Sequence, residues 1–146
     1  MKIAVVDGHG GGIGRAIIDK IRVAFGEDIH IVALGTNALA TAAMLKAGAN
    51  EGATGENAIV VNVEDADIII GSVAILVVNG LMGELTEKMV SAIGKSKAEK
   101  VLIPLNKCKI TLAGVVNKPL PHYIDDAISI IGNLSGCKRL DKIQTE

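Results

Sequence analysis

The composition of the chain narrows the function classes that are open to it. Its 146 residues fit one domain of ordinary size, and 49% of them are hydrophobic, enough for a full core. Aromatic residues make up only 1%, which argues against the stacking platforms of single-stranded nucleic-acid binding. The formal net charge is −1, so no broad basic surface is expected for a phosphate backbone. We therefore expect no nucleic-acid partner.

The sequence also gives no sign of a membrane or metal partner. The chain starts directly with a strand pattern and lacks the pattern of a signal peptide. The longest apolar-rich run, residues 68–78, is interrupted by Gly71 and Ser72 and is too short to span a bilayer. Cys108 and Cys137 form neither a C-x-x-C pair nor a zinc spacing, so no metal site is expected. A reduced, cytoplasmic protein is the expectation.

The most informative stretch is a strand–turn–helix pattern near the N-terminus. Residues 3–6 are an apolar run typical of a buried strand, and five glycines follow within residues 8–14. Apolar spacing then predicts a helix over residues 12–25. Such a turn lets backbone N–H groups approach an anion, to which the helix N-terminus adds a partial positive charge. The alternative is a tight turn that needs glycine only for packing.

The glycine spacing resembles one nucleotide-binding fingerprint and departs from others. G-x-G-x-x-G from Gly8 fails at Ile13, whereas G-x-x-x-G-x-G fits Gly8, Gly12 and Gly14. The run thus resembles the fingerprint of the short-chain dehydrogenases/reductases, which have Rossmann folds. Those enzymes need a Tyr-x-x-x-Lys pair, but the single tyrosine, Tyr123, has no lysine four residues on. A Walker-type Gly-Lys-Ser/Thr is also missing, as is an acidic residue for ribose at the end of the second strand.

The middle of the chain alternates between strand and helix patterns. We expect His30 to be a half-buried structural residue and Thr36 or Asn37 to cap the following helix. Residues 58–63 are ambiguous: too few residues separate them from the next strand for two parallel strands, so we favour a helix over about 55–64 and keep a strand open. The other predicted segments are a strand at 29–34, a helix at 38–47, a polar loop at 49–57 and a strand at 67–71.

The last part of the chain predicts two helices and two further strands. These are a helix at 85–95, a strand at 101–105, a strand at 109–115 and a helix at 122–133. Only residues 106–108 separate the two strands, which favours an antiparallel hairpin. The predicted fold is therefore α/β: a three-layer Rossmann-like sandwich whose mainly parallel sheet of about five strands has an antiparallel edge hairpin. We expect a single domain over 1–134 and a C-terminal tail over 135–146.

Ligands of such sheets bind outside the carboxyl ends of the strands. This rule brings together residues 7–14, 35–37, 71–72 and 106–108, and the loop over 50–57 could fold over them. The candidate cofactor-binding residues are Asp7, Gly8, His9, Gly10, Gly11, Gly12, Ile13, Gly14, Thr36 and Asn37.

Several side chains carry candidate chemistry beside a plainer structural role. Asp7 suits a ligand hydroxyl, a metal or a capping contact, and His9 suits phosphate contact or acid–base work unless it is merely an exposed turn residue. Cys108 follows a lysine that can lower a thiol pKa, although a small buried thiol is the alternative. His122 and Cys137 receive no role. No catalytic residue is assigned.

Taken whole, the chain resembles a family of short, functionally uncharacterised bacterial proteins known as a domain of unknown function. The resemblance implies no activity, but it adds weight to Thr36, Asn37, Asn57 and Asn106. It covers nearly the whole chain apart from the tail, and the segments that carry it are 7–14, 34–44, 47–50, 54–57, 83–86 and 104–108.

The leading hypothesis is binding of a nucleotide or another phosphate-containing small ligand at the strand carboxyl ends. The cofactor is unidentified, with a nucleotide or dinucleotide as the candidate. One alternative is a small enzyme that acts on a phosphorylated or carboxylate metabolite through His9, Asp7 or Cys108. The other is an oligomeric interaction subunit without a small ligand. The alanine-rich helix at 38–47 and the apolar stretch at 72–82 favour a homo-oligomer.

Overall fold

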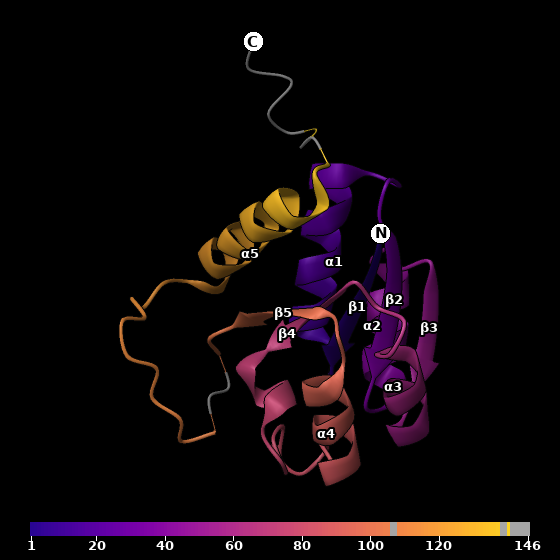
Figure 1. Ribbon diagram of the computed structural model, residues 1–146, viewed down its shortest axis with the longest axis vertical. Helices are drawn as coiled ribbons and strands as arrows, with labels where there is room; N and C mark the ends of the chain where they lie inside the picture. The colour runs from indigo at the N-terminus through magenta and orange to yellow at the C-terminus, as the bar shows by residue number, and fades with distance from the viewer. Residues whose placement is uncertain (106–107, 138–139, 141–146) are drawn as a thin grey trace.

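The computed structural model describes residues 1–105, 108–137 and 140 of the chain. There, a five-stranded sheet lies between two layers of helices (Figure 1). The strand order is β3-β2-β1-β4-β5, and every neighbouring pair is parallel. The strands are β1 Lys2–Asp7, β2 His30–Gly35, β3 Glu51–Thr54, β4 Ile68–Ser72 and β5 Glu99–Ile103.

Five α-helices and one short 3-10 helix occur in this described part. They are α1 Gly12–Phe25, α2 Ala38–Lys46, α3 Glu56–Asn62, η1 Val73–Leu76, α4 Glu87–Lys95 and α5 Leu120–Ser135. Side chains of α1, α2 and α5 fill the core on one face of the sheet, and those of α3, η1 and α4 fill the other. The predicted α/β class with a parallel sheet is confirmed. No helix in the described ranges is long and apolar enough to cross a bilayer.

Side chains alternate along β1, and this determines where its last residue points. Ile3 and Val5 lie in the core against α1, whereas Val6 lies in the core against α4. Successive side chains of a strand point to opposite faces, so Asp7 follows Val5 onto the α1 face. Strands covered on both faces are apolar throughout, which is why the sequence identified β1 and β2 readily.

The predicted antiparallel edge hairpin is wrong. The described edge strand on that side is β5, and it pairs in parallel with β4. Residues 110–112 have no regular structure, and Cys108 and Lys109 have φ angles of +49° and +64°, which a strand does not contain. The apolar composition of residues 109–115 therefore belongs to a connecting arm that leads into α5 (Figure 1).

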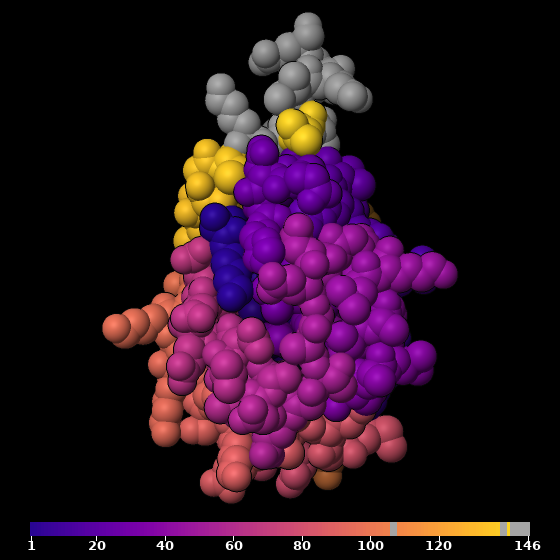
Figure 2. Space-filling model, turned by 90° about the vertical axis from the view of Figure 1, so that its right-hand side faces the viewer, coloured from indigo at the N-terminus to yellow at the C-terminus, as the bar shows by residue number. Residues whose placement is uncertain are grey.

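The fifth strand is instead β3, which lies within the segment expected to be a polar loop. It occupies the opposite sheet edge, the side that faces the viewer in Figure 2, where the purple to magenta surface of the middle of the chain is seen. Three of its four residues are exposed, so it has neither an apolar run nor an alternating pattern. This absence of burial explains why the sequence pattern missed it.

Other local expectations have mixed outcomes. The ambiguous residues 58–63 lie mostly in helix α3, as favoured. The bounds predicted for α1 match the structure, while α4 starts two residues later than expected and α5 starts two residues earlier. His30 is exposed rather than half-buried, and its Nε2 lies 3.7 Å from Oε2 of Glu51.

Candidate functional site

The last residues of the five strands form a row along the carboxyl edge of the sheet. Asp7 pairs with Gly35, Gly35 with Thr54, and Ser72 with Ile103. Continuing the β1–β4 register by two residues brings Ser72 level with Asp7. The chain reverses its order across the sheet between β1 and β4, and this is where open α/β sheets bind ligands. The glycine turn after β1 therefore lies at the expected place.

Asp7 closes the glycine turn from inside. Its side chain is buried, with Oδ1 accepting a hydrogen bond from Gly8 N at 2.8 Å and Oδ2 accepting one from Gly14 N at 2.7 Å. Burial raises the pKa of Asp7, although the two backbone donors and nearby His9 act in the opposite direction. Both carboxylate oxygens bond to the turn and the side chain is buried away from solvent, so Asp7 serves the capping role among the three that the sequence allowed.

The glycines divide into two groups with different roles. A Cβ at Gly11 would lie 2.8 Å from backbone of α2, and one at Gly14 would lie 2.5 Å from an α2 side chain. These positions need glycine for packing. A Cβ at Gly10 or Gly12 would meet nothing within 4 Å, so this part of the turn is open. Packing therefore explains the glycines at positions 11 and 14, whereas anion binding by the open part of the turn stays a prediction.

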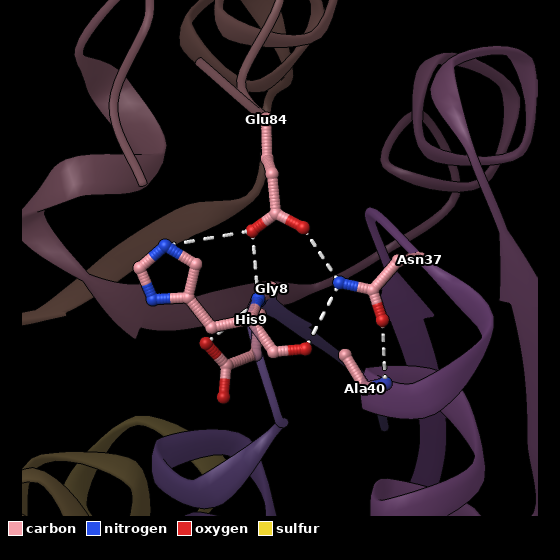
Figure 3. Close-up of polar contacts among 6 residues, drawn as sticks. Gly8, His9, Asn37, Ala40 and Glu84 are labelled. Atoms are coloured by element: carbon pink, nitrogen blue, oxygen red, sulfur yellow. Dashed lines mark hydrogen bonds and ion pairs between the residues drawn. The ribbon is translucent and has the colours of Figure 1, made fainter. Parts of the chain in front are cut away.

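Glu84 joins the glycine turn to the start of α2 (Figure 3). Its Oε2 accepts a hydrogen bond from His9 N at 2.7 Å, and its Oε1 accepts one from Asn37 Nδ2 at 2.6 Å. Asn37 Nδ2 also donates to His9 O at 2.9 Å, while Asn37 Oδ1 caps α2 by accepting from Ala40 N. The expected capping role of Asn37 is confirmed, and its amide group has no unused hydrogen.

The network keeps the Glu84 carboxylate ionised. Burial opposes the charged form, but the His9 backbone donor, the Asn37 amide and the nearby His9 ring outweigh it and lower the pKa of Glu84. Oε2 of Glu84 lies 3.7 Å from Nε2 of His9. The Thr36 hydroxyl also lowers the pKa of Glu84, although its buried Oγ1 has no hydrogen-bond partner.

A compact loop over residues 77–84 presents Glu84 to the turn. Asn79, Leu81 and Met82 all have positive φ angles, between +52° and +63°, an uncommon conformation for residues other than glycine. Backbone hydrogen bonds hold this shape, including Asn79 N to Leu85 O at 2.8 Å. Sequence reasoning missed Glu84 because 75 positions separate it from His9; the one signal was its place in the family-like segment 83–86.

Three backbone donors of the turn remain unused. No hydrogen bond within the described part of the chain uses the N–H groups of Gly10, Gly12 or Ile13. The N-cap of α1 is Gly11, which offers no side-chain cap, and the first turn of α1 has no acidic residue. Asp7 compensates the first turn of α1 at Gly14 N, whereas the N–H groups on the side where Gly10 and Gly12 are open have no acceptor among the described residues.

Ser72 ends β4 level with Asp7, whose carboxylate holds the first turn of α1. It is only 2% exposed, and its Oγ has no hydrogen-bond partner. Ile68 and Ile70 of β4 belong to the core that α1 covers, so strand alternation places Ser72 on that same face. A buried hydroxyl without a partner costs about 1–3 kcal/mol. The junction of β1, β4 and α1 thus has unused hydrogen-bonding capacity.

The other residues that the sequence singled out are not part of the site at the glycine turn. Exposed Cys108 lines a cavity of about 530 Å³ together with Tyr123, and His9 is not among its lining residues. Asn57 lines a separate groove between α3 and α4. His122 is exposed at the start of α5. Residues 106–107, and with them candidate Asn106, lie outside the described residues.

Comparison with known proteins establishes the family. The chain matches the family described as "Domain of unknown function (DUF3842)" over residues 2–135. The chain belongs to this family. The expected resemblance is therefore confirmed, and the glycine turn, Glu84 and Ser72 all fall within the DUF3842 match. No curated protein matches the chain.

Among solved structures, this DUF3842 chain is similar to a dodecameric FMN-dependent UbiX-like decarboxylase from Escherichia coli O157:H7. The two chains share 11% identity over 95% of this chain and 97% of the other, with a TM-score of 0.45. So distant a likeness carries no argument about ligand, chemistry or assembly.

Proposed function

We propose that this protein binds a nucleotide or another phosphate-containing small ligand at the carboxyl ends of its strands. The anion would accept hydrogen bonds from the N–H groups of Gly10, Gly12 and Ile13. The observation that carries the proposal is the pairing of these unused donors with the buried, unpartnered hydroxyl of Ser72. A phosphate group accepts from both kinds of donor.

Charge and shape support the same ligand class. The N-terminus of α1 carries the equivalent of roughly half a positive charge, which attracts an anion. The open side of Gly10 and Gly12 allows a ligand to approach the backbone closely. Asp7 and Glu84 occupy other donors of the turn, so the phosphate would sit towards β4 and away from Glu84.

The experiment compares two glycine variants by isothermal titration calorimetry. The ligands are inorganic pyrophosphate and the 5′-diphosphates of the four common ribonucleosides. We expect at least one to bind wild type, and Gly12→Val to abolish binding because the new side chain covers the anion position. Gly94→Val is the matched control: Gly94 lies in α4, and a Cβ there also meets nothing within 4 Å.

Either of two results would overturn the proposal. One is wild type that binds none of these compounds. The other is equal affinity of the Gly12→Val and Gly94→Val variants for the ligand, since the ligand would then bind elsewhere.

A further inference from the structure

We propose that Glu84 binds the ribose hydroxyls of the ligand, which makes the ligand class a ribonucleotide with an unmodified 2′-hydroxyl. This inference rests on the proposed function. Rossmann-like sheets hold the ribose of a dinucleotide with an acidic residue after the second strand, but Gly35, Thr36 and Asn37 supply none here. The structure brings the carboxylate of Glu84 to this place from the loop before α4.

The position of Glu84 is fixed by its hydrogen bonds. Oε1 lies 2.6 Å from Nδ2 of Asn37, and Asn37 stands two residues beyond the end of β2. Asn37 uses both amide hydrogens on Glu84 and His9, and its Oδ1 caps α2. Asn37 is therefore a positioning residue. Glu84 is therefore the residue that contacts the ligand.

Glu84 retains the capacity to bind two hydroxyl groups. Each carboxylate oxygen has two lone pairs and accepts one hydrogen bond from the protein, from Asn37 at Oε1 and from His9 N at Oε2; the Thr36 hydroxyl and the His9 ring lie near the carboxylate without a further hydrogen bond to it. The side chain is 27% exposed, so a ligand can reach it. As an ionised carboxylate it accepts hydrogen bonds without donating any, which suits the two O–H donors of a ribose diol.

The hydrogen-bonding groups next to Glu84 follow the same order as the sugar and phosphate groups of a nucleotide. Glu84 holds the N–H of His9, and the next residue, Gly10, supplies the first unused donor. Along the sheet edge from β2 to β4, the site thus presents a carboxylate for the sugar, then N–H groups for phosphate, then the Ser72 hydroxyl. A phosphate on the 2′-oxygen would meet the Glu84 charge and be rejected.

The test measures affinity by calorimetry for matched ligands. The ribonucleoside 5′-diphosphate that binds most tightly is compared with its 2′,3′-dideoxy counterpart, its 2′-phosphorylated counterpart and inorganic pyrophosphate. In wild type we expect the ribose form to bind about ten- to a hundredfold more tightly than the dideoxy form, the range for hydrogen bonds to a charged group. The 2′-phosphorylated form should bind more weakly still.

The variant that isolates the carboxylate is Glu84→Gln, with Glu87→Gln as control. Glu87 is an exposed carboxylate three residues on, in the first turn of α4. We expect Glu84→Gln to bring the ratio of ribose to dideoxy affinity close to one while pyrophosphate still binds. Glu87→Gln should keep the wild-type ratio.

Failure of this inference differs from failure of the proposed function. Equal affinity of wild type for the ribose and dideoxy forms overturns the role of Glu84 and leaves phosphate binding intact. This measurement needs no variant. A ratio that Glu84→Gln leaves unchanged also overturns it. Absence of binding by pyrophosphate and by all diphosphates overturns both.

Discussion

Two carboxylates share one glycine turn, in opposite electrostatic settings. Asp7 is enclosed, and burial raises its pKa despite two backbone donors. Glu84 is less enclosed, and burial is outweighed by the His9 N–H and the Asn37 amide, so its pKa is lowered. Asp7 holds the turn from within, whereas Glu84 braces it from outside and keeps an open side toward solvent.

The lowered pKa of Glu84 predicts a pH-dependent contribution to stability. A carboxyl group whose pKa is lower in the folded state stabilises the fold above its ordinary pKa, about 4.5, and loses that effect as pH falls through the folded value. We expect Glu84→Gln to lower the free energy of unfolding at pH 7, and the difference from wild type to shrink below about pH 4.5. Urea denaturation at pH 7, 5 and 3.5 measures this.

Glu87→Gln serves again as control, since Glu87 is exposed and has no resolved pKa shift to lose. A Glu84→Gln deficit of the same size at all three pH values would show that the carboxylate charge is not what braces the turn. The charge of Glu84 also helps to raise the pKa of Asp7, so Glu84→Gln shifts the pKa of Asp7 downward and the measured difference contains both effects.

At the scale of elements, burial decided what the sequence could predict. Helix α1 was predicted to the residue because Ile17, Ile21 and Ala24 follow a helical spacing and are all buried. The predicted strand at 109–115 was wrong because its apolar residues lie on a connecting arm and not in a sheet. In β3 the opposite occurred: a real strand with exposed residues showed no pattern.

The candidate site was predictable only as far as strand ends could be aligned. The turn after β1 and Asn37 do meet, through Asn37 Nδ2 and His9 O, because neighbouring parallel strands end at the same edge. Glu84 reaches the turn from a loop whose left-handed residues set its direction. No local pattern encodes that conformation. Ligand binding by these residues stays a prediction.

Tyr123 anchors the arm that precedes α5. The hydroxyl of Tyr123 donates to Val116 O at 2.8 Å and accepts from Lys118 N at 3.2 Å, while the residue itself is buried in the core. We expect Tyr123→Phe to cost about 1 kcal/mol of stability and to speed hydrogen exchange at the Lys118 amide, because this N–H loses its acceptor and Val116 O loses its donor. Exchange measured by mass spectrometry tests this, with β1 peptides as internal control. Unchanged exchange in the arm would contradict its anchoring role.

For the whole molecule, two exposed large apolar side chains stand on the segments that the Glu84–Asn37 hydrogen bond joins. Met82 is 94% exposed and Leu39 is 68% exposed. Each stands two residues along the chain from a member of the hydrogen-bonded pair Glu84 and Asn37. Exposed apolar groups that gather on one surface mark contact sites between proteins. This placement supports the expectation of a homo-oligomer, which stays a prediction.

We therefore expect the wild-type protein to self-associate and Met82→Ser to weaken that association. Replacing the most exposed of these apolar side chains removes burial at the contact without disturbing the core, so the folded monomer should persist. Val23→Ser is the matched control, because Val23 is 64% exposed on the far half of α1. Sedimentation velocity over a range of concentrations distinguishes the variants. A monomeric wild type, or an equal effect of the two substitutions, would rule out an interface at these apolar side chains.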